Sequence, residues 1–460
     1  MSFDLRELNT ETAPLQVKYS QITPLALSAS SKRVSFFPSN AGTFGPNSVI
    51  RIPISSSTCF LDGTLSCLKF TYKNKSADGA QIDNSAHSFI QSIRVISRSG
   101  GVDLENIRYY NKLVAMLSDL QLNDTDRAAP YHEGYGAGNR ANVPLLVSVV
   151  AVADTAAAVK VKLDLMLAEI NKTSKSDYMG TNEPIIATTE SMDFYLPLLS
   201  AVLGTAQSKY LPLYLCGQID LEIQLANFPT ISVTNDSAPS FEISNVSFDT
   251  QLIEFAGDMN NTLMHLCKQT GLYIHSTSWY CDKIAVLAGS SISVLVSERL
   301  KSVKSLFCYT SLPRTNGLQR EHARTASICK SFQLKCGSTF FPNQPVLSTD
   351  SKASNNGSFI TETYKALGLY ADTHGKSLMN AGNFESDGHT FNSVGRAIFG
   401  CDLDAFVSKH SAIESGFDFV NNNPTNINMV GTFVNSDFYI HILHDILIKI
   451  DSNFTLTASR

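Results

Sequence analysis

The chain has 460 residues, of which 43% are hydrophobic and 17% charged, with a formal net charge of -5 and a pI near 6.1. This composition excludes a disordered chain, and the mildly acidic balance gives no global attraction to nucleic acid or to an anionic membrane surface. The length suits two domains of roughly 200 residues each. The first residues lack the basic start and apolar core of a secretory signal, and no run of roughly 18 apolar residues predicts a membrane span.

The domain layout follows from where the strand pattern begins and where it is interrupted. Residues 1–45 are polar, contain several prolines and keep no helical or strand period, so we expect an extended N-terminal arm. Strand-like segments then fill 46–255 and, after a break, 273–460. We therefore expect a first domain at 46–255, a linker at 256–272 and a second domain at 273–460.

Alternation of apolar and polar residues predicts half-buried antiparallel strands in the first domain. Leu68, Phe70 and Tyr72 alternate with lysine and threonine. The same period of two recurs over 159–165 and 219–225. Each segment would place one row of side chains in a core and the other in water.

A strand, a glycine turn and a helix are expected between 88 and 117. A strand is predicted by β-branched residues separated by polar ones, at Ile90, Ile93, Val95 and Ile96. Gly100-Gly101 suits a tight reversal, because glycine adopts positive φ at little cost. Beyond a short strand, Asp103 is expected to cap a helix. Its apolar face would hold Ile107, Tyr110, Leu113 and Leu117.

The second half repeats this order. After a strand at 241–255 and a short helix at 258–270, with Leu263, Leu266 and Cys267 on one side, strands resume at 283–296 and 302–309. Further predicted features are a strand through Phe332, Leu334 and Cys336, a break at 337–346, a helix at 358–370, a loop at 421–428 and alternating strands from 438 to 456. The strand, glycine turn and helix thus recur about 250 residues after their first occurrence, which indicates an architectural repeat.

Two long polar connections, 123–143 and 171–190, suggest binding to neighbouring subunits, because loops of this length are uncommon in compact domains without such a role. The glycine-rich stretch 132–140 lacks the spacing and flanking residues of a phosphate-binding loop, and we expect a surface loop there.

The sequence contains no strong candidate for a catalytic or ligand-binding site. Asp103 and Glu105 are explained by the attraction of carboxylates to a helix start, and His441 and His444, beside Asp445, by solvated positions on a strand. The nine cysteines are scattered without a CxxC pair, which predicts free thiols in a reducing compartment. No serine lies in a GxSxG context. We expect no catalytic, cofactor-binding or metal-ligating residues.

Two passages resemble one protein family. The first is IRVISRSGGVDLENIRYYNKLVAML, and the second is FQLKCGSTFFPNQPV followed by TETYKALG. Both resemble the strand, turn and helix of the double-jelly-roll major capsid proteins of the adenovirus and tailless-phage lineage, most closely those of Polinton-like viruses and virophages. The resemblance implies an all-β fold of two tandem eight-stranded antiparallel jelly rolls, with short helices in the loops.

The resemblance also implies a function. It predicts a homotrimer that forms a pseudo-hexameric capsomer and tiles an icosahedral virion shell. Its partners would be neighbouring capsomers, minor capsid or penton proteins and, through the N-terminal arm, an internal membrane, with no direct binding to nucleic acid and no cofactor.

Two other functions stay open. A β-sandwich adhesin or lectin would need a signal peptide, a metal loop or paired cysteines, and a β-sandwich glycan-active enzyme would need a carboxylate pair on facing strands. The sequence carries none of these features in a recognisable form.

Overall fold

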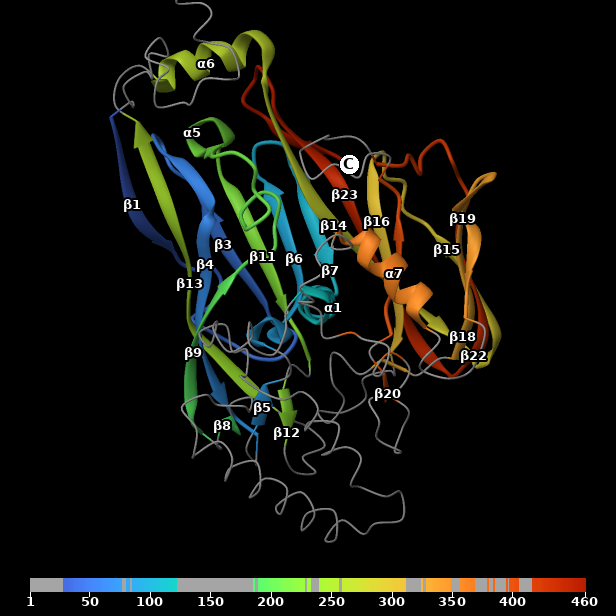
Figure 1. The fold of residues 1–460 in the computed structure, drawn as a ribbon. Helices are drawn as coiled ribbons and strands as arrows, with labels where there is room; N and C mark the ends of the chain where they lie inside the picture. Colours follow the sequence, from blue (N-terminus) through green and yellow to red (C-terminus); the bar gives the residue numbers. More distant parts are fainter. Residues whose placement is uncertain are drawn as a thin grey trace, which may run out of the picture.

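A computed structural model places most of the residues it describes in antiparallel β-sheets, with a few short helices (Figure 1). The structure describes residues 28–76, 80–82, 85–121, 185–186, 189–227, 230–232, 240–255, 259–311, 324–325, 328–348, 356–368, 379, 384, 394–395, 397–404 and 416–460. The strand expected at 159–165 and the loop at 123–143 lie outside these residues, as does most of 171–190. None of the described helices is long and apolar enough to cross a membrane.

The first half of the chain forms two facing sheets and a small third one. The strands of the first sheet are β1 (Ala29–Phe36), β13 (Phe241–Phe255), β4 (Phe60–Asn74) and β10 (Leu211–Pro212), with β2 (Thr43–Phe44) on β13 and β9 (Ser191–Pro197) on β4. The second sheet has the order β3 (Val49–Ile54), β11 (Ile219–Leu225), β6 (Ile90–Ser97) and β7 (Val102–Arg108). The small sheet consists of β12 (Thr230–Ser232), β5 (Ala80–Ile82) and β8 (Ile185–Ile186).

The predicted alternation explains how these sheets enclose a core. Leu68, Phe70 and Tyr72 on β4 are at most 2% exposed, whereas the residues between them face outward. The expected strands at 219–225 and 241–255 are confirmed as β11 and β13. Part of the expected N-terminal arm is instead a strand of the sheet. Residues 29–36 form β1 and pair along their whole length with β13. These residues therefore belong to the first sheet.

The hairpin of β6 and β7 turns at glycine, as predicted. Gly101 has φ +59, a conformation that glycine adopts without a steric penalty. Gly100 has a different role, because a Cβ atom there would lie 2.7 Å from the carbonyl oxygen of Leu456. The turn thus permits a close approach between two segments that are far apart in the sequence.

In the described part of the first half and the segment that follows it, there are four helices. They are η3 (Ala86–Phe89), α1 (Tyr110–Gln121), α5 (Leu213–Cys216) and α6 (Met259–Thr270). The prediction of a helix start at Asp103 is wrong, because β7 continues to Arg108 and α1 begins only at Tyr110. The short helix expected at 258–270 is confirmed as α6.

The second half again forms two facing sheets. The first contains β14 (Leu272–Val286), β23 (Ser436–Ile450), β16 (Val303–Ser311), β17 (Arg324–Thr325) and β20 (Val394–Gly395), with β21 (Phe399–Asp402) on β16 and β24 (Leu456–Ser459) on β23. The second has the order β15 (Gly289–Val296), β22 (Thr425–Phe433), β18 (Ile328–Cys336) and β19 (Thr339–Leu347). Helix α7 (Gly357–Ala366) follows β19.

The two halves have the same strand order, which confirms the predicted repeat. The order β3-β11-β6-β7 corresponds to β15-β22-β18-β19, and β1-β13-β4-β9 corresponds to β14-β23-β16-β21. In each half a helix follows the edge strand, α1 after β7 and α7 after β19. Each half is therefore a jelly roll of eight corresponding strands, and a continuous cluster of buried hydrophobic residues extends through both.

Two predicted breaks are strands instead. Residues 340–346 belong to β19, at the edge of its sheet, where Pro342 and Pro345 are tolerated because an edge strand need not donate every N–H to a neighbour. Thr425–Asn428 begins β22, where buried Ile427 lies between asparagines that face outward.

Candidate functional site

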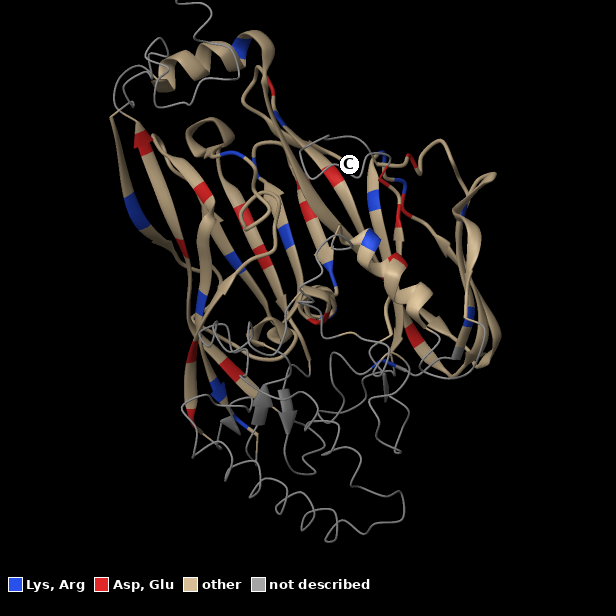
Figure 2. Cartoon of the chain, in the orientation of Figure 1, with Lys and Arg blue, Asp and Glu red and all other residues tan. Residues whose placement is uncertain are grey.

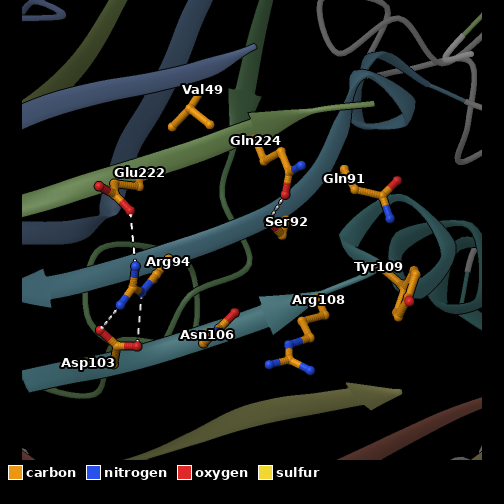
Figure 3. Close-up of a pocket in the computed structure, with 10 residues that line it drawn as sticks. All are labelled: Val49, Gln91, Ser92, Arg94, Asp103, Asn106, Arg108, Tyr109, Glu222 and Gln224. Carbon is orange, nitrogen blue, oxygen red and sulfur yellow. Dashed lines mark hydrogen bonds and ion pairs between the residues drawn. The ribbon is translucent and has the colours of Figure 1, made fainter. Parts of the chain in front are cut away.

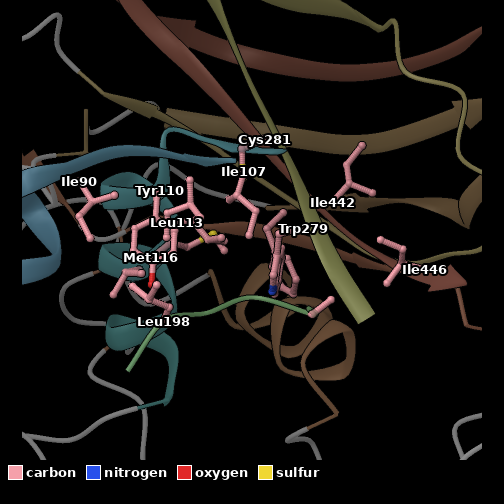
Figure 4. Packing of buried hydrophobic residues seen from close by; sticks show 14 of the residues in the cluster. Ile90, Ile107, Tyr110, Leu113, Met116, Leu198, Trp279, Cys281, Ile442 and Ile446 are labelled. Carbon is pink, nitrogen blue, oxygen red and sulfur yellow. The ribbon is translucent and has the colours of Figure 1, made fainter. Parts of the chain in front are cut away.

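The junction between the two jelly rolls combines apolar packing with buried polar contacts. Figure 4 shows residues from both rolls in one hydrophobic cluster. The first roll contributes Ile90, Ile107, Tyr110, Leu113, Met116 and Leu198, and the second Trp279, Cys281, Ile442 and Ile446. Because burial of apolar surface is the main favourable term in folding, this contact fixes the rolls against each other.

A buried carboxylate lies at this junction. Glu105 on β7 is 1% exposed and accepts hydrogen bonds from the Ser200 hydroxyl, from the Ala201 N–H at 3.0 Å and from the Ser278 hydroxyl on β14. Burial raises the pKa of Glu105 because a low-dielectric site disfavours the charged form, and the three donors oppose this shift. The helix-start interpretation of Glu105 is wrong, since its partners come from a loop and from the second roll.

The loop that holds Ser200 also forms hydrogen bonds with β14. Ser276 donates its hydroxyl hydrogen to the Ala206 carbonyl oxygen, and the Ser208 hydroxyl donates to the carbonyl of His275. The loop of the first roll therefore both donates a hydrogen bond to β14, the edge strand of the second roll, and accepts one from it.

A second polar contact joins α1 to the second roll. Arg324 Nη1 on β17 lies 2.8 Å from Asp119 Oδ2 on α1, and both side chains are fully buried. The Arg324 guanidinium also covers the ring of Tyr309 at 4.9 Å, and the Tyr309 hydroxyl donates to the Lys112 carbonyl at 3.3 Å. The sequence separation of these groups hides this network from any local pattern.

The prediction that His441 and His444 are solvated is wrong. Both are at most 2% exposed. Desolvation is the main cause that lowers the pKa of His441 to about 3 and that of His444 to about 4, so both rings are neutral at physiological pH. The two histidines contact different groups, His441 Nδ1 the thiol of Cys281 at 3.0 Å and His444 Nδ1 the carbonyl of Asp445 at 2.9 Å. Within the described ranges no group of three His, Cys, Asp or Glu side chains is placed to hold a metal ion.

The outer face of the β3-β11-β6-β7 sheet carries paired charges around a recess of about 600 Å³ (Figure 3). Arg94 lies 2.7 Å from Asp103 and 3.4 Å from Glu222, and Glu222 also pairs with Arg51. Both carboxylates are thus matched by guanidinium groups. This arrangement suits polar surface contacts, and it lacks the unpaired acid and base that general acid-base catalysis requires.

The corresponding face of the second roll is poor in charge (Figure 2). Its register aligns Ser293, Asn428 and Gln333 in one row. The strands of this sheet also carry exposed apolar residues, namely Leu295, Phe340, Leu347 and Val430. Exposed apolar surface with few charges is typical of a face that another protein covers.

The cysteines are free thiols, as predicted. All nine lie in the described part of the chain, and all except the half-buried Cys67 are buried. Burial raises the pKa of Cys281, Cys308 and Cys401 well above the ordinary thiol value, so these groups stay protonated and weakly nucleophilic.

The chain is similar to known proteins in its structure. No protein-family model matches the sequence, and no curated protein matches it. PBCV-1 VP54, as fitted into a reconstruction of the virophage Sputnik, is similar over 96% of this chain and 99% of its own, with a TM-score of 0.57 and 9% identity. The Faustovirus major capsid protein is similar over 93% and 91%, with a TM-score of 0.58 and 8% identity.

The structure of the Sputnik virophage gives a third match, over 95% of this chain and 90% of its own, with a TM-score of 0.54 and 12% identity. These matches extend over both jelly rolls, and they agree with the corresponding strand orders described above. The chain therefore has the double jelly-roll fold found in these viral capsid structures.

Proposed function

We propose that this protein is a major capsid protein, three copies of which form a pseudo-hexameric capsomer that tiles an icosahedral virion shell. The observation that carries the proposal is the pair of jelly rolls with corresponding strand orders in one chain. Three such chains supply six similar walls, and cyclic assembly of identical subunits is a common way to close an oligomer. The structural similarity to capsid proteins over nine tenths or more of both chains supports the same role.

The rigid junction supports this proposal on physical grounds. A wall of a shell must transmit load between its two halves, and the hydrophobic cluster and the buried Asp119–Arg324 pair hold the rolls at a fixed angle. The charge-poor face of the β15-β22-β18-β19 sheet can be covered by a neighbouring copy at little electrostatic cost. We propose a structural protein and no enzyme.

The proposed partners are other copies of this chain, neighbouring capsomers, minor capsid or penton proteins and an internal membrane reached by the N-terminal arm, without direct nucleic-acid binding. The proposed division of the chain is an N-terminal arm before β1, a first jelly roll at 29–255, a linker that includes α6, and a second jelly roll at 272–460. The free thiols fit synthesis in a reducing compartment.

The decisive experiment is the solution mass by light scattering after size exclusion. Three copies of the 50.2 kDa chain give about 151 kDa, and we expect this mass together with hexagonal particles in negative stain. A protein that stays at 50.2 kDa on concentration would contradict the proposal and return attention to the adhesin, lectin and glycan-active alternatives.

A further inference from the structure

The contact between α1 and the second roll encloses a histidine. His441 on β23 is 0% exposed and packs against two tyrosine rings, with its ring centroid 5.5 Å from that of Tyr309 and 6.4 Å from that of Tyr439. Its Nδ1 lies 3.0 Å from the sulfur of Cys281, and its Nε2 lies 3.4 Å from the Tyr309 hydroxyl oxygen. The ring therefore has neighbours on three strands, β14, β16 and β23.

The first roll is what separates this histidine from water. The Tyr309 hydroxyl donates to the Lys112 carbonyl of α1 at 3.3 Å, and the Lys112 ammonium lies over the Tyr439 ring at 5.4 Å. Tyr109 adds an edge contact to the Tyr439 ring at 5.6 Å. His441 shares a sheet face with both tyrosines, because Tyr309 pairs with Tyr439 and alternate residues of a strand point the same way. Departure of the first roll from this face would therefore hydrate His441.

The charged groups that face His441 are cations. They come from the first roll, as Lys112 on α1, and from β17, as Arg324, and both repel a positive charge on the ring. The carboxylate of this cluster, Asp119 on α1, is already paired with Arg324 at 2.8 Å. The strands packed against the ring contribute neutral groups, namely the thiol of Cys281 and the hydroxyls of Tyr309 and Tyr439. Within the described ranges no carboxylate contacts the imidazole, so nothing there compensates a proton on it.

A proton therefore binds His441 far more weakly in the closed junction than in water. Burial is the largest cause that lowers its pKa to about 3, and the two cations add to it, whereas the ordinary value is 6.5. A state in which the first roll has moved away binds the proton at the ordinary value, so that state gains on the closed one as pH falls below 6.5. Between pH 7 and 5 this single site should raise the ratio of open to closed molecules about 25-fold.

We propose that the junction opens in mild acid, because a proton that binds His441 releases α1 and the first roll from the face of β16 and β23 that they cover. Glu105 acts in the opposite direction, since burial raises the pKa of this carboxyl and its protonated form favours the closed junction. The proposal concerns a single chain and holds whether or not the protein builds a capsid.

Thiol labelling of the full chain measures this opening. Cys281 contacts His441 on the covered face, whereas Cys308 lies next to Tyr309 on β16 and so points to the opposite face, into the second roll's own core. The protein is treated with a pyridyl disulfide at pH 5, 6 and 7, and each labelled cysteine is quantified by peptide mass spectrometry. Each rate is divided by that of a free model thiol at the same pH. Opening of the junction labels Cys281 alone, and unfolding of the second roll labels both.

His441→Gln isolates the histidine, because it removes the titratable ring and keeps a neutral hydrogen-bonding side chain. Glu105 is present in both proteins, so its opposing contribution cancels in the comparison. We expect the change in Cys281 labelling from pH 7 to pH 5 to be about 25-fold larger in the unchanged protein than in this variant. His265→Gln is the matched control, because His265 is exposed on α6, and it should leave the response unchanged.

Glu105→Gln keeps the test decisive even if His441→Gln opens the junction at every pH. This variant retains His441 and lacks the opposing carboxyl, so its own Cys281 labelling should rise at least about 25-fold from pH 7 to pH 5, with Cys308 unchanged within about twofold. Three results would overturn the proposal: no rise at Cys281 in Glu105→Gln, an equal rise at Cys281 and Cys308, or the same response with and without His441.

Discussion

The carboxylate of Glu105 on β7 accepts a hydrogen bond from the hydroxyl of Ser278 on β14, 173 residues away, and so connects the two jelly rolls at a position closed to water. No local sequence pattern pairs these two residues. The contact nevertheless contributes to how the stability of this protein depends on pH.

Glu105→Gln should reduce that pH dependence. Because burial raises the pKa of Glu105 in the folded state, its protonated form favours folding, and this contribution is lost as pH rises through the folded-state pKa. Urea unfolding of both proteins between about pH 4.5 and 8 should therefore show the unchanged protein losing stability relative to the glutamine variant as pH rises. A constant difference across this range would contradict the prediction.

Glu105→Ala is the companion variant. It leaves the Ser200, Ser278 and Ala201 donors without their acceptor, and we expect a loss of about 1–3 kcal/mol or more at every pH. The comparison separates the charge of Glu105 from its role as an acceptor.

Removing one partner of the buried pair Asp119–Arg324 should lower the free energy of unfolding strongly, whereas replacing both partners with apolar residues should change it little. Asp119→Leu or Arg324→Met alone would bury one unmatched charge and lower the free energy of unfolding by about 3–5 kcal/mol. The double variant should recover most of this loss, as measured by urea unfolding in a double-mutant cycle. Additive losses in the double variant would mean that the two charges do not interact.

Gly101→Val should weaken the β6–β7 hairpin. A β-branched residue at φ +59 is strained, by about 1–2 kcal/mol for the left-handed region, and we expect less soluble protein and a lower Tm. Gly101→Asn is the control, because asparagine adopts this region more readily. Equal stability of the two variants would show that the turn geometry differs from the one described.

Native thiols should be nearly inert to alkylation. With eight of nine cysteines buried, intact mass after iodoacetamide at pH 8 should show at most one added group in the folded protein, lost in Cys67→Ser, and nine after unfolding without reductant. Fewer than nine groups after unfolding would indicate a disulfide.

Val430→Lys should shift the assembly toward monomer. Val430 is 51% exposed on the charge-poor face, and a buried lysine without a partner there would cost binding free energy. Light scattering should record a mass that falls from about 151 kDa toward 50.2 kDa, with the Tm of the monomer little changed. Leu65→Lys, at a site 68% exposed on β4, is the control expected to keep the full mass.

Sequence patterns were most informative where a residue's surroundings are local. The alternation at Leu68, Phe70 and Tyr72 predicted a strand with one buried row, and the glycine turn at 101 was placed correctly. Asp103 was misassigned because a carboxylate near a helix looks the same whether it caps that helix or pairs with Arg94 across a hairpin.

The junction could not be predicted for a related reason. His441 lies on β23, an inner strand of its sheet, on a row that would face water in an isolated sandwich and is buried here beside Arg324 and Tyr309. Its environment depends on how the two rolls meet, as do the partners of Glu105. No period in a single strand encodes that arrangement.

The close approach of Leu456 to Gly100 also bears on the order of events during synthesis. Arg460, beyond the same strand, donates to the Leu104 carbonyl across 356 residues of sequence, at 3.5 Å. At ordinary translation rates this interval takes roughly 20–70 s. The first roll is therefore synthesised well before β24. Until β24 is made, the surface of the first roll near Gly100 and Leu104 stays exposed, and during this period it is a surface that chaperones can protect.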